Sequence, residues 1–278
     1  MHAPVNHQRR RLALALLAMP ALPLENAHAA TPGDPLALKL LIVGRRKPGT
    51  TLAEHRHHIR RVHGELVLGY IAADAAHAPR RYVQNTVFDG QFRATAPGSD
   101  PLALNRDFVT QVWFPDFAAL ARSRETRYYL DKLKGDEDNF VDQASVVFLP
   151  SRERVLHARA GGAPAGTVKL MGFLQRAGGV AEAAFERGWA EAVAKLPRAA
   201  VQRHVQNRVA SPPAAAGKPP AVDGIDELWL EDEAAARALL GAWQAAVRES
   251  LVRPGLVAEG SPFALLMHED VIHAGART

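Results

Sequence analysis

The residue best placed for acid–base chemistry in this sequence is His63. It lies near the end of a helical pattern that runs from Leu52 to Tyr70. At about 100° per residue, His63 falls on one stripe about 100° wide, so we expect it to face a sheet. The other residues of this stripe are Leu52, His55, Ile59, Val62, Leu66 and Tyr70. An imidazole exchanges protons near neutral pH, which suits it to deprotonate an acidic carbon or phenol. We predict that His63 is a general acid or base; the alternative is a core histidine bonded to one backbone carbonyl.

Further polar candidates lie on the alternating segment 80–88, which predicts a strand. Alternation puts Asn85 between two valines on one face, and Tyr82 and Gln84 on the other. The valines favour the first face packing against the helices, which would bring Asn85 to His63 in a catalytic site. Tyr70, on the same helical stripe, is the third predicted catalytic residue, because it could orient or protonate a substrate. Tyr82 and Gln84 would instead point into the opposite layer and bind ligand there.

A histidine-rich segment, 54–58, invites comparison with metal sites. His55 and His63 are eight residues apart, or roughly 12 Å along a helix, which is too far for one ion. His55 and His58 have a chelating spacing, but no third ligand is identifiable. We therefore predict no metal site.

Composition excludes several classes of protein. The 278 residues are 47% hydrophobic and 23% charged, as in a globular protein, and they include no cysteine. Disulfides and thiol catalysis are therefore excluded. The pI is 9.7 but the net charge is only +5, and no basic run with interleaved aromatics occurs. We predict no nucleic-acid binding.

Residues 1–29 are predicted to be a signal peptide. Arg9, Arg10 and Arg11 precede an apolar run from Leu12 to Leu24, and residues 27–29 read Ala-His-Ala. The run has about 13 residues where a membrane-spanning helix needs about 20, so no integral span is predicted. The arginines resemble a twin-arginine signal, which predicts a periplasmic or exported protein. The alternatives are a Sec signal or an apolar N-terminal helix.

The body of the chain repeats one order of elements. Residues 36–46, 80–88, 106–114 and 139–150 predict strands, and 52–70 and 115–133 predict helices, in the β-α-β-β-α-β order of a ferredoxin-like module. The second half predicts strands over 168–179, 202–210, the start of 225–243, and 261–273, with helices over 180–196 and the rest of 225–243. Val-Gln-Asn occurs at 83–85 and again at 205–207. We interpret the chain as a tandem duplication with modules at 36–157 and 167–275.

The second module is predicted to be a degenerate partner. Val193 occupies the place of His63, His204 that of Tyr82, and Trp229 that of Trp113. A linker is expected over 159–166 and a flexible insertion over 211–220. The predicted binding residues are Tyr82, Gln84, Trp113, His204, Gln206 and Asn207. For the repeated Gln and Asn, the alternative is that their amides satisfy buried backbone groups.

Five motifs resemble the EthD-domain family. They are Arg46-Lys47-Pro48-Gly49, Val62-His63, Arg81-Tyr82-Val83-Gln84-Asn85, Trp113-Phe114 and Asn139-Phe140-Val141-Asp142. The resemblance implies a dimeric α+β barrel, an α+β fold in which two ferredoxin-like modules face each other. A tandem chain would close this barrel within one monomer; the alternative is a homodimer. The superfamily includes haem enzymes, although no axial-ligand signature stands out, so the expected cofactor is none.

The resemblance also implies a function. Relatives tailor polyketides and aromatic compounds, by decarboxylation, dehydration or cofactor-free oxidation. We expect an exported enzyme, of the lyase, isomerase or cofactor-free oxygenase type, that acts on a small hydrophobic molecule through His63. The alternative is a non-catalytic binding or accessory barrel. An enclosed apolar cavity joining His63, Asn85 and Tyr70 would favour the enzyme.

Overall fold

The computed structural model describes residues 36–91, 102, 104–159, 168–210 and 220–275. The predicted signal peptide lies outside this part of the chain, as do most of the predicted linker and insertion. The first half contains β1 (Leu38–Gly44), α2 (Leu52–His57), the π-helix η1 (His58–His63), α3 (Gly64–Ala73), β2 (Arg81–Gln91), β3 (Phe108–Phe114), α4 (Phe117–Glu125), the π-helix η3 (Tyr129–Leu133), α5 (Glu137–Phe140) and β4 (Val147–Ala158).

The second half follows a matching order with fewer helical segments. It contains β5 (Val168–Leu174), α6 (Glu182–Ala194), the short η4 (Arg198–Ala200), β6 (Arg203–Val209), β7 (Gly224–Leu230), α7 (Glu233–Val247), the π-helix η6 (Arg248–Val252) and β8 (Phe263–His273). No helix in the described part of the chain is long and apolar enough to cross a membrane.

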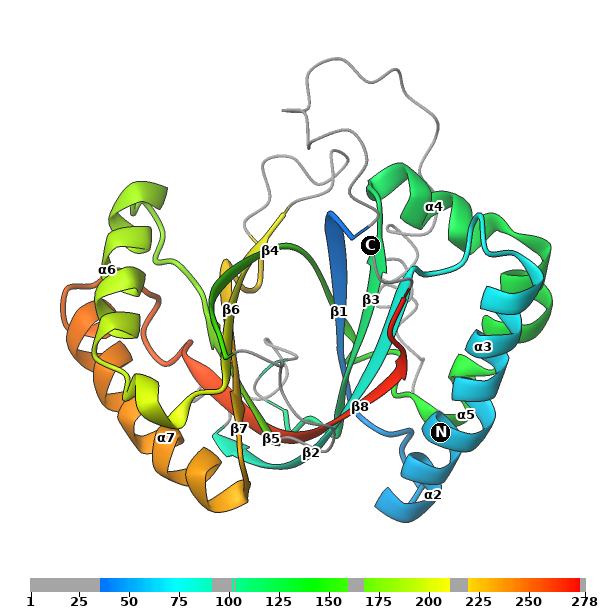
Figure 1. The fold of residues 1–278 in the computed structure, drawn as a ribbon, viewed down its shortest axis with the longest axis horizontal. Coiled ribbons are helices and arrows are strands. Elements are labelled where there is room, and N and C mark those ends of the chain that lie inside the picture. Colours follow the sequence, from blue (N-terminus) through cyan, green and yellow to red (C-terminus); the bar gives the residue numbers. More distant parts are fainter. Residues whose placement is uncertain (1–35, 92–101, 103, 160–167, 211–219, 276–278) are drawn as a thin grey trace, which may run out of the picture.

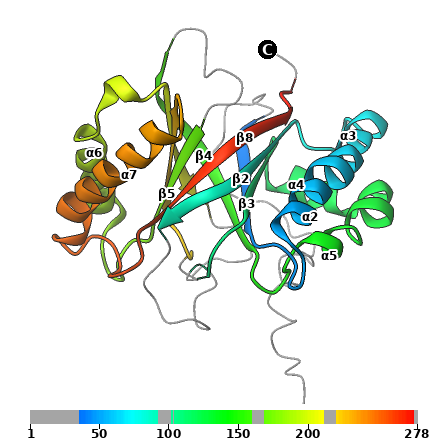
Figure 2. The same ribbon diagram turned by 90° about the horizontal axis from the view of Figure 1, so that it is seen from below.

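The eight strands close into one antiparallel barrel within a single chain. Their order is β1-β3-β2-β8-β5-β7-β6-β4. Two of the neighbours join the halves: β2 pairs with β8, and β4 pairs with β6. In Figure 1 the helices of the two halves lie on opposite sides of the barrel, and Figure 2 shows β2 and β8 side by side. Closure covers the sheet face that the helices leave open, which an open sheet could not do alone.

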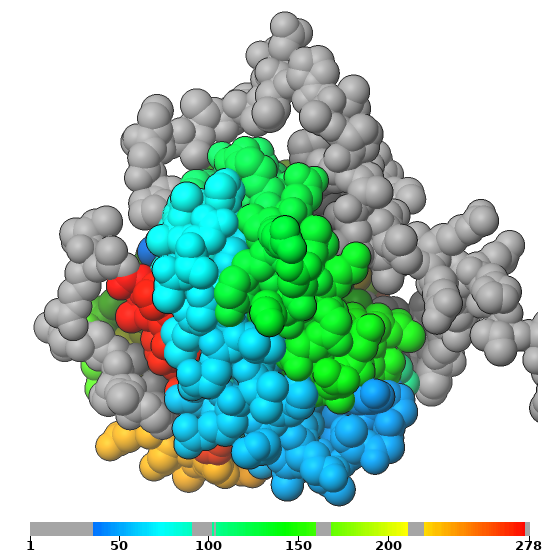
Figure 3. Space-filling model, turned by 90° about the vertical axis from the view of Figure 1, so that its right-hand side faces the viewer, coloured from blue at the N-terminus to red at the C-terminus, as the bar shows by residue number. Residues whose placement is uncertain are grey.

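Both faces of the strands are therefore buried, in different layers. The outer face packs under helices; the segments 52–73 and 117–140 lie next to each other over the first half (Figure 3). The inner face fills the barrel. One end of the interior is apolar, with Leu41, Val109, Met171 and Phe173 in its core. The other end holds buried charged and amide side chains, described below.

The first helical segment departs from the predicted periodicity. Thr51 caps it in a capping box with Glu54. The turn from 58 to 63 is π-helical, which adds one residue to the turn. Val62, predicted to be on the buried stripe, is consequently 38% exposed, whereas Val67 takes its place in the core.

The last predicted strand of the first half was also partly wrong. Residues 139–150 were expected to form it, but Asn139 and Phe140 end α5, and Val141 makes only an isolated bridge with Arg46. The continuous strand begins at Val147. Phe140 and Val141 are buried against Ile59 and Phe108 without belonging to a strand. The apolar pattern therefore predicted a strand where the residues are only buried.

Gly172 on β5 provides a test of this packing. A Cβ built on it would lie 2.4 Å from the indole of Trp243, a buried residue of α7. Gly172→Ala should therefore lower the free energy of unfolding by about 1–3 kcal/mol, as measured by urea denaturation. Gly241→Ala on α7 is the matched control, since its Cβ has nothing within 4 Å. It should raise stability by about 0.5–1 kcal/mol, and a similar loss in both variants would contradict the proposed clash.

Candidate active site

His63 forms a hydrogen-bonded pair with a carboxylate from another segment. Its Nδ1 lies 2.9 Å from Oδ2 of Asp136, and Nε2 of His58 lies 2.8 Å from Oδ1 of the same side chain. His58 and His63 are five residues apart, the spacing of one π-helical turn, so η1 brings both imidazoles to one carboxylate. Asp136 precedes α5, which packs against η1.

The histidines are also held by an aromatic ring. Phe140 is buried, and its centroid lies 4.9 Å from that of His63 and 5.0 Å from that of His58. His55 packs on the other side at 5.8 Å and bonds the Phe140 carbonyl through Nδ1 at 3.0 Å. Burial lowers the pKa of His55, which favours its neutral form. Among these histidines, His55 is thus the core histidine bonded to one backbone carbonyl.

The carboxylate is held in its charged form. Burial alone would raise the pKa of Asp136, but the hydrogen bonds from His63 and His58 outweigh it, and the pKa lies below its ordinary value. Asp136 therefore fixes the orientation of the His63 ring and can stabilise a proton on it. This is the role of the buried carboxylate in nucleophile–histidine–carboxylate sites.

A small cavity of about 50 Å³ opens beside His63. Its walls include Phe108, Phe140 and Phe148, and Arg124 and Glu137 also line it. Within the described chain, Nε2 of His63 has no hydrogen-bond partner, and the side chain is only 12% exposed. His63 thus lines a small cavity with phenyl and aliphatic walls, and one of its imidazole nitrogens is free.

An ion pair forms the polar part of the cavity. Nη1 of Arg124 lies 3.1 Å from Oε1 of Glu137 and also contacts the Tyr129 hydroxyl. That hydroxyl donates to Glu137 at 3.2 Å. Burial raises the pKa of Tyr129 to about 12, so the phenol stays protonated at neutral pH.

The other two predicted catalytic residues do not reach His63. The Tyr70 hydroxyl donates to the Ser123 carbonyl at 3.0 Å and accepts from Thr126, inside the helical layer. Asn85 faces the barrel interior, where Nδ2 donates to the Val109 carbonyl at 2.8 Å. Neither lines the cavity beside His63.

The predicted orientation of the 80–88 strand was therefore wrong. Gln84 faces the helices, because its Nε2 donates to the Ile59 carbonyl and to the Tyr82 hydroxyl, both at 2.6 Å. Alternation correctly divided the side chains of this strand into two sets, but the layer predicted for each set was wrong. In a closed barrel both faces are buried, so valines are equally compatible with either.

The inward-facing polar residues form a buried cluster shared by the two halves. Lys39 pairs with Glu153 at 2.9 Å and with Glu227, and Lys169 pairs with Glu227 at 3.0 Å and with Glu269. We call these five residues the barrel ion cluster. Amide and indole groups complete its hydrogen bonds: Gln111 donates to Glu227, Trp113 to Glu153, Trp229 to Glu269, and Asn207 to Glu227.

The positions predicted to bind ligand thus have different environments. Trp113 and Asn207 belong to the surroundings of the barrel ion cluster. The amides of Asn85 and Asn207 also donate to neighbouring strand carbonyls, as does Gln84 to a helix carbonyl. The backbone-satisfying alternative is confirmed for Gln84, Asn85 and Asn207. It does not hold for Gln206, whose amide oxygen accepts from Arg154. His204 and Gln206 line a separate cavity in the second half.

Asp136, Phe140 and Arg124 are the site residues that sequence reasoning did not select. Phe140 lies in a quoted family motif, Asn139-Phe140-Val141-Asp142, but was assigned to a strand. Asp136 lies in an acidic run, 136–138, that resembles a solvated turn. Only its proximity to two histidines would have distinguished it.

The structure thus defines an α+β barrel with a histidine–carboxylate pair between the sheet and the helices of its first half. Residues 47–144, which contain this pair, match the model of the EthD domain. This part of the chain is therefore similar to an EthD domain. None of the curated proteins compared with the chain matches it significantly.

Some solved structures show a distant likeness to this chain at low sequence identity. An anthrone oxidase-like protein is 11% identical, with 86% of this chain and 94% of that chain covered and a TM-score of 0.48. A variant of chlorite dismutase from Candidatus Nitrospira defluvii is 8% identical, with 86% and 94% covered and a TM-score of 0.47. A heme-binding protein from Thermus thermophilus is 9% identical, with 84% and 91% covered and a TM-score of 0.45. Activity does not follow from likenesses at this level.

The described residues do not fit a haem group. The helices α6 and α7 contain no histidine, and their Trp189 and Trp243 are buried with both indoles donating to Asp226. The cavity beside His63 is far too small for a macrocycle.

Proposed function

We infer that this protein is an enzyme that moves a proton on a small hydrophobic molecule with His63. The observation that carries the proposal is the geometry of one imidazole. Nδ1 is bonded to the ionised Asp136, whereas Nε2 is free within the described chain and faces a cavity with aromatic walls. Nε2 is therefore the atom that would take a proton from an acidic carbon or phenol.

The neighbouring groups support this role. With Nδ1–H donating to Asp136, the neutral imidazole keeps its lone pair on Nε2, the form that a general base requires. Arg124 lies at the same cavity and can stabilise negative charge that develops on a substrate oxygen. The phenyl walls fit an aromatic or polyketide-like substrate, and the same proton can return from Nε2 to another carbon or oxygen.

Substrate entry requires movement of one wall. A cavity of about 50 Å³ holds a functional group or a water rather than a whole substrate. Its outer wall is the turn at 141–146, where Gln143 is exposed. We infer that a substrate displaces this turn and places only its reacting edge beside His63.

The proposal includes the finer features expected from the sequence. The duplicated element order and the two inter-half strand pairs support two ferredoxin-like, EthD-like modules that close one barrel. The N-terminal arginines and apolar run support export through the twin-arginine route. No cofactor takes part in the proposed proton transfer.

Hydrogen–deuterium exchange tests the chemistry without knowledge of a product. Anthrone and 2-tetralone carry methylene protons acidified by a neighbouring carbonyl, so a base that removes one in D₂O replaces it with deuterium. The protein should accelerate this exchange, followed by proton NMR, above the rate in buffer. Absence of acceleration with both ketones would favour the non-catalytic binding barrel instead.

A further inference from the structure

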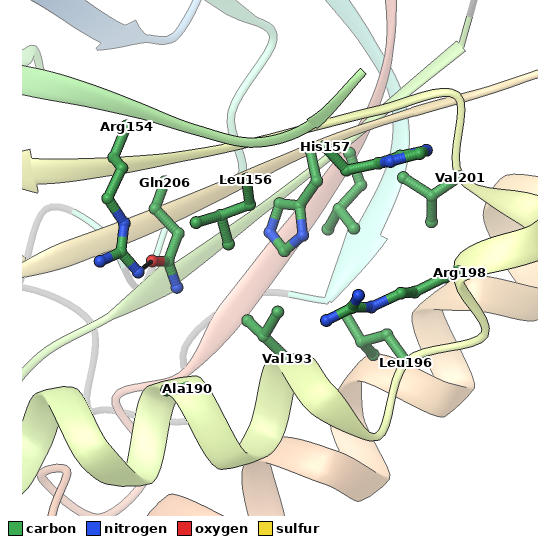
Figure 4. Close-up of a pocket in the computed structure, with 11 residues that line it drawn as sticks. Arg154, Leu156, His157, Ala190, Val193, Leu196, Arg198, Val201 and Gln206 are labelled. Carbon is green, nitrogen blue, oxygen red and sulfur yellow. Dashed lines mark hydrogen bonds between the residues drawn. The ribbon is translucent and has the colours of Figure 1, made fainter. Parts of the chain in front are cut away.

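A second cavity, of about 220 Å³, lies where the two halves of the chain meet. We call it the junction cavity. β4 of the first half forms one wall, and α6, β6 and the segment around Arg198 in the second half form the others. Figure 4 shows His157 on β4 pointing toward α6, with Arg198 reaching into the same space from the other side. The site is complete only when β4 pairs with β6.

The inner surface of the junction cavity is apolar. Val193, Leu196, Val201 and Leu228 line it, and each is at most 8% exposed. Its volume lies below the range of about 300–1,000 Å³ typical of drug-sized ligands. An occupant should therefore be small, with an apolar body of roughly one ring.

The polar lining is positive and has no carboxylate to balance it. None of the residues that line the junction cavity is acidic. Arg154 and Arg198 have no carboxylate partner within the described chain, and Arg154 donates only to Oε1 of Gln206, at 2.9 Å. By contrast, Arg208 of β6, which does not line the cavity, pairs with Glu186. Two unneutralised guanidinium groups over an apolar floor favour an anion.

A buried polar group also faces this space. His204 is 5% exposed, and its Nε2 lies 2.9 Å from Oδ1 of Asp226. Asp226 accepts two indole hydrogen bonds as well, which holds the carboxylate and hence the imidazole in place. Nδ1 of His204 has no partner among the described residues, although the side chain lines the cavity. A built site therefore contains one fixed imidazole nitrogen beside two arginines.

The corresponding space in the first half is filled. There Gln84 bonds the Ile59 carbonyl and the hydroxyl of Tyr82, the residue that His204 replaces. In the second half Gln206 instead turns to Arg154, and the shorter valine at 193 leaves room. The sequence differences between the halves thus open a cavity rather than merely removing His63.

We propose that the junction cavity is a second small-molecule site, selective for small carboxylates with an apolar body, such as single-ring aromatic acids. The carboxylate binds Arg154 and Arg198, the ring packs on the apolar floor, and the free nitrogen of His204 accepts a hydrogen bond from any ligand hydroxyl. The proposal is independent of proton transfer at His63.

Isothermal titration calorimetry with benzoate and 4-hydroxybenzoate tests the site. Each should bind at one saturable site, whereas neutral benzyl alcohol should bind at least tenfold more weakly. Arg198→Gln and Arg154→Gln should each weaken benzoate binding about tenfold or more, since each loses a charge-assisted hydrogen bond. Ala190→Phe, which places a ring in the cavity from α6, should abolish binding.

Two variants serve as matched controls. Arg187→Gln makes the same charge change on an exposed α6 residue outside the cavity and should leave binding unchanged. His63→Gln should also leave it unchanged, which separates this site from the proposed active site. Absence of saturable benzoate binding up to about 10 mM, equal binding of benzyl alcohol, or equal losses in Arg187→Gln and Arg198→Gln would each overturn the proposal.

Discussion

His63→Gln should reduce the protein-catalysed exchange of methylene protons by about 10²- to 10⁴-fold. A glutamine side chain can keep a hydrogen bond to Asp136 but cannot take up a proton, so the variant preserves the packing against Phe140 while removing the base. The measurement is the initial rate of deuterium incorporation into anthrone, with variant and wild type at equal concentration and pH.

Two further variants test whether the expected loss of exchange is specific to the His63–Asp136 pair. Asp136→Asn should lower the rate about tenfold or more, because an amide no longer fixes the base-competent tautomer of His63. His57→Gln changes an exposed neighbour of the same helix and should have no effect. If His63→Gln exchanged protons as fast as wild type while remaining folded by circular dichroism, His63 would not be the base.

Glu227→Gln should lower the free energy of unfolding by about 3 kcal/mol at pH 7. The Glu227 carboxylate is fully buried and accepts from Lys39, Lys169, Gln111 and Asn207. An amide presents its own N–H groups to some of these donors and removes the negative charge between two lysines. Both modules contribute to this cluster, Lys39 and Glu153 from the first and Lys169, Glu227 and Glu269 from the second. Its loss should therefore weaken the whole barrel in one cooperative transition, measured by urea denaturation.

The loss of unfolding free energy in Glu227→Gln should depend on pH in a defined direction. Burial alone would raise the pKa of Glu227, but the charges of Lys169 and Lys39 outweigh it, and the pKa lies well below its ordinary value. A carboxylate of this kind stabilises the fold above its unfolded pKa of about 4.3, and this contribution is lost as the pH falls further. The difference between wild type and Glu227→Gln should therefore be full at pH 7 and shrink below about pH 4.

Glu153→Gln is the matched comparison for this result. Its side chain is 21% exposed and pairs with one lysine, so its replacement should cost about 1 kcal/mol. Losses of equal size at the two positions, or a Glu227→Gln loss that persists unchanged at pH 3, would show that shape rather than charge accounts for the effect.

Local pattern determined much of the architecture. Apolar runs and alternation located the eight strands, although β4 begins later than predicted, and the 3.6-residue period located the main helices. Each pattern reflects neighbours along the chain. The repeated order of elements, taken with the resemblance to the EthD-domain family, correctly predicted a barrel closed within one chain. The same local reasoning identified His63 as a residue between helix and sheet and excluded disulfides.

Tertiary structure alone decided which layer each strand face enters and which side chains meet there. The alternation of residues 81–87 separated Asn85 from Gln84, but in a closed barrel both faces are apolar enough to be buried, so pattern could not assign them. Lys39 and Lys169 lie in strands that resemble ordinary buried runs, and only closure of the barrel places glutamates of three strands, β4, β7 and β8, beside them. Likewise, Asp136 lies 73 residues from His63 in the chain, and the junction cavity needs β4 beside β6. Contacts between distant segments depend on how the halves close, which is a property of the whole chain and not of any local period.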